Sequence, residues 1–200
     1  MCESEGIQHL IVPQSEAYRI AAQAGKAYVR DCVCRAKEQN CSPETIDVCL
    51  LFEHACPEDL QAARLIPVEE ALAILEMTSQ WDGTYRLFFR EDTQVVTEIC
   101  SCCDCCCVPL RRTKREGNCA EQIRSGYVAV TDPELCVGCG ECLESCFFEA
   151  RQLENGVVSL IDGRCFGCGR CVQHCPEEAI SLLLDATRGI PIPDEFILQH

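Results

Sequence analysis

The chain has 200 residues, a formal charge of −15, and 21 cysteines against two methionines. So many cysteines indicate either a disulfide framework or metal-bound thiolates in one large domain or two small ones. The first residues lack the basic and apolar segments of a signal peptide, and no run of 18 apolar residues occurs. We therefore expect a cytoplasmic protein without a membrane span, whose thiolates bind metal. The acidic charge argues against nucleic acid as a partner and favours proteins with basic docking surfaces.

The first 56 residues are predicted to alternate strands and helices. An edge strand over residues 7–12 precedes Pro13, and Ser15 is expected to cap a helix over residues 16–24. A strand over residues 27–30 then leads into Cys32 and Cys34, and an apolar, buried segment covers residues 47–52. If the C-x-C segment is extended, both of its thiols point to the same face.

The middle of the chain reads as scaffold that ends in a block of cysteines. Residues 67–80 predict a helix with acidic residues in its first turn, and residues 85–90 and 93–99 predict a pair of strands. Six cysteines then occur within the eight residues 100–107, and metal ligation explains such a block better than core packing does. The basic residues 111–115 that follow form a solvated loop, neutralise cluster charge or dock an acidic partner.

Two copies of one unit follow residue 125, where the composition changes and we place a domain boundary. Each copy is predicted to run strand, cysteine loop, short helix, strand. The copies are offset by 29 residues, and each has the spacing C-x2-C-x2-C-x3-C of bacterial iron–sulfur runs. The eight cysteines of these runs are Cys136, Cys139, Cys142, Cys146, Cys165, Cys168, Cys171 and Cys175.

Residues 126–184 therefore resemble the bacterial-type ferredoxins that bind two [4Fe–4S] clusters. The resemblance implies a ferredoxin-like pseudo-twofold β-α-β repeat and one-electron transfer. In that family the fourth cysteine of each run binds the cluster of the other run. The implied ligands are Cys136, Cys139, Cys142 and Cys175 for one cluster, and Cys165, Cys168, Cys171 and Cys146 for the other. Phe147 stands where the family often has proline, and Phe147 or Phe148 is expected to screen a cluster from water.

Thirteen cysteines lie in residues 1–125, a region that we expect to be a small mixed α/β domain, and ten of them are candidate ligands. We predict that they bind one or two additional iron–sulfur clusters. Either two four-thiolate clusters leave two thiols spare, or two clusters use five thiolates each. These residues are Cys32, Cys34, Cys41, Cys49, Cys100, Cys102, Cys103, Cys105, Cys106 and Cys107. The isolated Cys2, Cys56 and Cys119 are not predicted to be ligands.

This cysteine-rich region and the acidic helix together resemble uncharacterised 4Fe–4S dicluster-domain proteins of anaerobic bacteria and archaea. That resemblance supplies little about function. The tail, residues 185–200, is expected to be extended and apolar, either packing back on the first domain or docking to a partner or a second subunit in a homo- or hetero-oligomer.

The sequence as a whole predicts an α+β, multi-cluster iron–sulfur protein that passes single electrons between redox partners. Two alternatives stay open. One is a redox enzyme or enzyme subunit with a catalytic cluster in residues 1–125, by analogy with the thiol/disulfide chemistry of heterodisulfide reductase. The other is a redox sensor or a scaffold for cluster assembly.

Overall fold

The computed structural model describes residues 6–38, 41, 45–116, 123–190 and 192. The strands are β1 (Ile7–Val12), β2 (Ala27–Asp31), β3 (Asp47–Phe52), β4 (Arg64–Ile66), β5 (Thr84–Arg90), β6 (Val96–Cys102), β7 (Ile123–Arg124), β8 (Tyr127–Thr131), β9 (Arg151–Glu154), β10 (Val157–Leu160) and β11 (Ile180–Leu184). The helices are α1 (Gln14–Ala22), α2 (Val33–Glu38), α3 (Pro57–Gln61), α4 (Val68–Ser79), α5 (Val108–Glu116), α6 (Glu141–Glu144) and α7 (Arg170–Gln173). This mixture confirms the α+β class.

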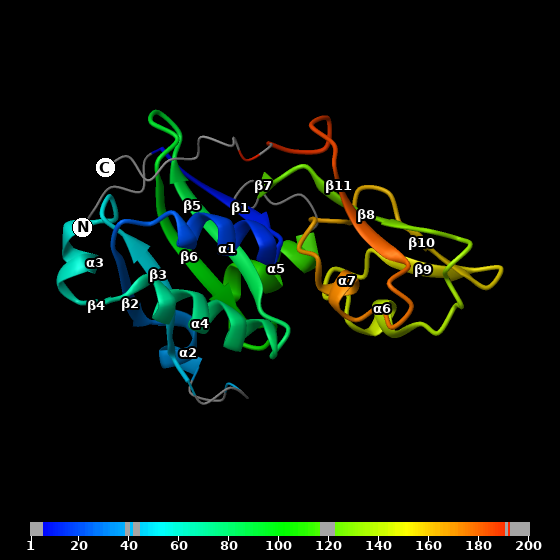
Figure 1. Ribbon diagram of the computed structural model, residues 1–200, viewed down its shortest axis with the longest axis horizontal. Helices are drawn as coiled ribbons and strands as arrows, with labels where there is room; N and C mark the ends of the chain where they lie inside the picture. The colour runs from blue at the N-terminus through cyan, green and yellow to red at the C-terminus, as the bar shows by residue number, and fades with distance from the viewer. Residues whose placement is uncertain (1–5, 39–40, 42–44, 117–122, 191, 193–200) are drawn as a thin grey trace.

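The first part of the chain is built on a seven-stranded sheet with the order β4-β2-β3-β6-β5-β1-β7. Its neighbouring strands are antiparallel except β1 and β7, which are parallel. The helices α1 and α4 lie side by side over one face of this sheet (Figure 1). Their apolar side chains and those of the central strands form the main core of the protein.

The alternation of side chains along β6 decides where the cysteines lie. Ser101 faces α4, since its hydroxyl accepts a hydrogen bond from the Thr78 hydroxyl at 3.2 Å, and Ile99 packs into the core beneath that helix. Because side chains alternate along a strand, Cys100 and Cys102 point to the opposite face of the sheet. Helix α5 and the C-terminal part of the chain cover the cysteines there.

The C-terminal part consists of two short antiparallel strand pairs, β8 with β11 and β9 with β10, joined through α6 and α7. Its halves repeat the order strand, cysteine loop, short helix, strand. The equivalent residues Gly138 and Gly167 both have φ of +70°, and a Cβ on either would collide with the carbonyl oxygen of Gly156 or of Tyr127. Glycine is therefore required at both places. In the part of the chain that the structure describes, no helix has the length and apolar character needed to cross a bilayer.

Several local predictions are corrected by the structure. Helix α1 begins at Gln14, so Pro13 is the N-cap residue and Ser15 lies inside the helix and does not cap it. Cys34 lies in α2, so the C-x-C segment is not extended. The basic residues 111–115 belong to α5 and do not form a loop. Strand β1 is not at the edge of the sheet, since the short β7 pairs beside it.

The described part of the tail packs against the protein. The Asp185 and Ile190 backbone amides donate to the carbonyls of Gly126 and Arg124, both at 2.8 Å, and Ile192 is buried in the main core. Of the two expectations for the tail, this contact favours packing back on the first domain. Residues 191 and 193–200 lie outside the described residues, so docking of the tail to a partner or second subunit stays a prediction.

Candidate metal centres

The eight cysteines of the repeated runs gather around two cavities in the C-terminal part. One cavity is lined by Cys136, Cys139, Cys142 and Cys175, which we call the distal site. The other is lined by Cys146, Cys165, Cys168 and Cys171, which we call the proximal site. Each set contains three cysteines of one run and the fourth of the other, as the resemblance to ferredoxins implies.

The surroundings of these thiols suit metal-bound thiolates. Burial raises the pKa of the Cys168 thiol to about 12 and that of Cys171 to about 11, so without metal both stay protonated at neutral pH. The positive charge of bound iron would favour the thiolates. The backbone amides of Ala150 and Ala179 donate to the sulfurs of Cys146 and Cys175, at 3.3 and 3.2 Å. Amides that point at ligand sulfurs in this way stabilise their negative charge.

Comparison with known proteins agrees with this geometry. The family model described as "4Fe-4S dicluster domain" matches residues 135–180. Residues 135–180 form a 4Fe-4S dicluster domain. This family implies two [4Fe–4S] clusters in the domain. Ferredoxin-2 from Desulfomicrobium norvegicum is 45% identical over 31 residues, which are 16% of this chain and 52% of that protein. The chain thus spans about half the length of the curated relative that it matches.

The two sites of the dicluster domain differ in charge, although they arise from one repeat. At the proximal site the buried Arg151, the first residue of β9, donates to Cys171 Sγ at 3.2 Å. The equivalent first residue of β11 is Ile180, which lines the distal cavity. Arg170 of the second copy likewise corresponds to Glu141 of the first copy, and Glu141 is exposed. The proximal site therefore has more positive surroundings.

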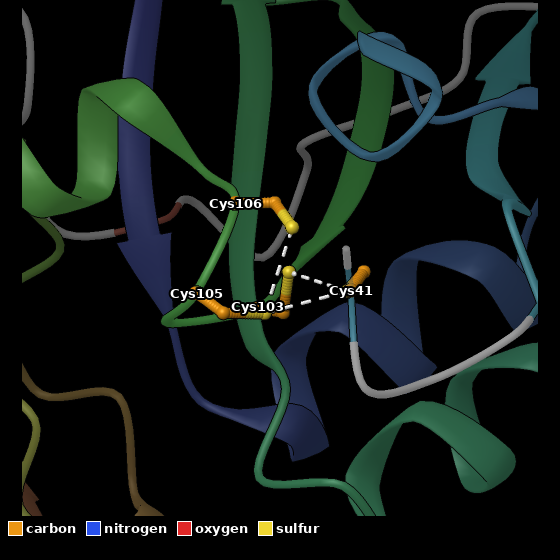
Figure 2. A group of neighbouring side chains, drawn as sticks. All are labelled: Cys41, Cys103, Cys105 and Cys106. Carbon is orange, nitrogen blue, oxygen red and sulfur yellow. Dashed lines mark hydrogen bonds between the residues drawn. The ribbon is translucent and has the colours of Figure 1, made fainter. Parts of the chain in front are cut away.

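The ten cysteines of the first part fall into two groups in space. The four-thiol group is Cys41, Cys103, Cys105 and Cys106, whose sulfur atoms all lie within 4.8 Å of one another (Figure 2). The remaining cysteines form a continuous series of thiol contacts in the order Cys32, Cys49, Cys100, Cys102, Cys107 and Cys34, and we call them the six-thiol group. The sequence allowed one or two clusters among these ten cysteines without assigning each thiol. The structure divides them into four and six, and each group takes cysteines from both segments.

A buried arginine contacts each group. Arg35, 1% exposed, donates to Cys103 Sγ at 3.5 Å, and its guanidinium lies 4.5 Å from the Trp81 ring centroid. Burial opposes ionisation of Cys103, but hydrogen bonds from Arg35 and a neighbouring thiol outweigh it and lower its pKa to about 7. Arg86, 5% exposed, lies beside Cys102 of the six-thiol group. Both cations are placed to offset the negative charge of thiolates.

Cysteines of the six-thiol group and of the proximal site contact one apolar cluster. Ile11, Leu110, Phe148 and Phe166 fill this cluster, and the Phe148 and Phe166 rings are 4.6 Å apart between centroids. Cysteines from both parts of the chain pack against it, namely Cys100, Cys102, Cys107, Cys146, Cys165 and Cys168. The expectation that a phenylalanine at 147 or 148 screens a site from water fits the buried Phe148, which lines the proximal cavity.

An ion pair between Arg170 and Asp104, which we call the clamp, also joins the first part of the chain to the C-terminal part. Arg170, on α7 next to Cys171, binds both carboxylate oxygens of Asp104 at 2.7 and 2.8 Å. Asp104 lies between two cysteines of the four-thiol group. Asp82 contacts Arg170 at 3.7 Å and also the ring of His174. Of the three cysteines predicted not to be ligands, Cys56 is disulfide-bonded, while Cys2 and Cys119 lie outside the described residues.

Sequence reasoning missed the arginines at these sites. Arg151 interrupts the repeat where Ile180 continues an apolar pattern, and alignment of the two copies with each other would have found it. Arg35 follows Cys34 directly, but nothing in the sequence relates it to Cys103, which is 68 residues away. The Arg170–Asp104 pair likewise joins residues 66 positions apart and leaves no local signal.

Proposed function

We propose that this protein is an iron–sulfur electron carrier that moves single electrons between the dicluster domain and a further metal centre in residues 1–125. The observation that carries the proposal is the shared apolar cluster. It places Cys102 and Cys107 against the same side chains as Cys146, Cys165 and Cys168. When bound, the [4Fe–4S] clusters supply one-electron transfer, and the protein supplies their positions.

The contact between the two parts suits this role. Buried apolar side chains exclude water, so little solvent has to reorganise when charge moves between the sites. The Arg170–Asp104 clamp holds the cysteine turn of the first part against α7. We propose the crossed ligand sets and pseudo-twofold repeat of the two-cluster ferredoxins for residues 126–184, and an additional iron–sulfur cluster on the six-thiol group.

The surface around the distal site supports a basic protein as electron partner. Cys139 is exposed there, and the neighbouring Val137 and Leu135 are 65% and 52% exposed. Exposed acidic residues flank the cysteines of the distal site in the sequence, namely Glu134, Glu141, Glu144, Glu177 and Glu178, and Glu177 also lines the distal cavity. An apolar contact inside an acidic rim is suited to a transient partner with a basic docking surface. We further propose a reducing, anaerobic cytoplasm as its location, because the metal-binding thiols must stay reduced, although Cys56 is disulfide-bonded.

An anaerobic reductive titration followed by electron paramagnetic resonance tests the proposal. The dicluster domain accounts for about two electrons per chain, one for each cluster. We expect a further reversible electron from the centre in residues 1–125, and a Cys102→Ser variant should lose that electron while keeping the other two. Uptake of only two electrons by the wild-type protein would contradict transfer between the two parts.

A redox enzyme is the second candidate, and the six-thiol group is what favours it. Six thiols exceed the four that a [4Fe–4S] cluster uses, so two remain for a substrate thiol or disulfide. Cys100 is also placed for chemistry, because its thiol lies 2.9 Å from a carboxylate oxygen of Glu98. A change in the resonance signal of the reduced protein on adding a small disulfide would favour the enzyme, and an unchanged signal would favour the carrier.

A further inference from the structure

We propose that the four-thiol group binds a single tetrahedral metal ion, zinc or iron, and not an iron–sulfur cluster. Cys41 Sγ lies 3.3 Å from Cys103 Sγ and 3.4 Å from Cys105 Sγ, and Cys106 Sγ lies 3.6 Å from Cys105 Sγ (Figure 2). Thiolates bound 2.3 Å from one tetrahedral ion are separated by about 3.8 Å. The four sulfurs therefore need only small shifts to surround one ion.

The dicluster domain supplies an internal comparison. In a [4Fe–4S] cluster each thiolate binds a different iron at a corner of the core, so the four sulfurs stand farther apart than around one ion. Among the described residues, two groups of potential ligands have all their ligand atoms within 4.8 Å of one another, namely the four-thiol group and the set Cys49, Glu98 and Cys100. Neither group includes a cysteine of the distal or proximal site, and the four-thiol group is the one of the two that offers four thiols. Its sulfurs are therefore closer together than those of the two sites in the dicluster domain.

The local chain builds this site from two segments. Cys103, Cys105 and Cys106 lie in the turn between β6 and α5, which is closed by a hydrogen bond from the Cys107 amide to the Cys103 carbonyl at 3.2 Å. Cys41, which comes after α2 in the sequence, supplies the fourth thiol (Figure 2). Four thiolates fill every position of a tetrahedral ion, which is the arrangement of a structural site, and all-sulfur ligation selects zinc or iron.

The charge of the surroundings agrees with one divalent ion. Four thiolates and one divalent ion carry a net charge of about −2, which is costly beside a protein core. Arg35 offsets part of it through its hydrogen bond to Cys103. Its position is fixed by bonds to the carbonyls of Thr45 and Ser101, at 3.2 and 3.3 Å. This ion would tie the segment at Cys41 to the turn that Asp104 clamps onto the dicluster domain.

The inference is tested by counting metal and acid-labile sulfide in the full chain purified without oxygen. Iron–sulfur clusters of the [4Fe–4S] type contain iron and sulfide in equal numbers. A single-ion site adds metal without sulfide, so we expect zinc plus iron to exceed sulfide by about one per chain. Elemental analysis by mass spectrometry identifies the ion, since zinc and iron are counted separately. The count does not depend on whether the protein carries electrons.

Two exposed cysteines provide matched variants. Cys105→Ser should abolish the excess of metal over sulfide and leave the sulfide count unchanged. Cys139→Ser, in the distal site, should lower iron and sulfide together and leave the excess in place. No excess in the wild-type protein, an unchanged excess in Cys105→Ser, or a loss of equal iron and sulfide from Cys105→Ser would each overturn the proposal. If Cys105→Ser does not fold, the excess of zinc plus iron over sulfide in the wild-type protein is the measurement that decides between a single ion and a cluster.

Discussion

The unequal charge of the two dicluster sites makes a quantitative prediction for Arg151→Gln. This change removes the buried cation that donates to Cys171 Sγ and keeps a side chain that can donate a hydrogen bond. Reduction adds one negative charge to a cluster, and a nearby cation stabilises that charge. We therefore expect the variant to be harder to reduce at the proximal site.

The magnitude follows from the position of Arg151. The 3.2 Å contact is with one ligand sulfur, whereas the added electron is shared over the whole cluster, so we take an effective separation of about 6 Å. At an effective dielectric constant of about 20 this gives about 3 kcal/mol. Since 1.4 kcal/mol corresponds to about 59 mV for one electron, the potential of the proximal site should fall by about 120 mV.

A redox titration monitored by electron paramagnetic resonance, without oxygen, would measure this shift. Arg164→Gln is the matched control, because it removes the same charge beside Cys165 from an exposed position. Water screens exposed charges, so the control should shift the potential by no more than about 30 mV. Equal shifts in both variants, or a shift confined to the distal site, would refute the argument from buried charge.

Three further changes probe the contacts around the proximal site. Asp104→Ala leaves the buried Arg170 without its bidentate partner, and because Asp104 is itself partly exposed we expect a loss of about 1–3 kcal/mol, seen as a lower midpoint of anaerobic thermal unfolding. An unchanged midpoint would mean that the clamp does not stabilise the fold. Phe148→Ala removes a buried ring, should cost about 3–5 kcal/mol and should speed the bleaching of the protein in air, whereas the half-buried Phe147→Ala should bleach like wild type. Gly167→Ala places a methyl group against the Tyr127 carbonyl, so iron content should fall by about four per chain, and a full complement would show that the loop can adapt.

The extent to which sequence predicts this protein differs between its two parts. In the dicluster domain the strand order follows from the repeat, and the grouping of the eight cysteines was implied by the resemblance to the two-cluster ferredoxins. In the first part, the strands and α4 follow from apolar patterns, and the buried segment at 47–52 is strand β3. The condition that the C-x-C segment is extended is not met, because α2 begins at Val33 and includes Cys34.

The division of the ten cysteines could not be predicted, because it depends on contacts between distant segments. Cys103 and Cys107 are four residues apart, yet they belong to different groups. Cys103 meets Cys41 across the turn, and Cys107 meets Cys34 of α2. The spacing of cysteines along the sequence predicts which thiols share a site when one short segment supplies most of the ligands. It does not do so when the ligands come from distant segments. Here three chain segments converge, and their register is set by the sheet.

The divergence of the two repeats also bears on how a partner is released. In the proposed carrier, an electron on the distal site adds negative charge to the acidic surface around Cys139, where a basic partner docks. An electron on the proximal site lies instead beside the buried Arg151 and Arg170. The affinity for the partner then depends on which site is reduced. Inward movement of the electron weakens the attraction to the protein that has just donated it, so each transfer favours dissociation of the spent donor.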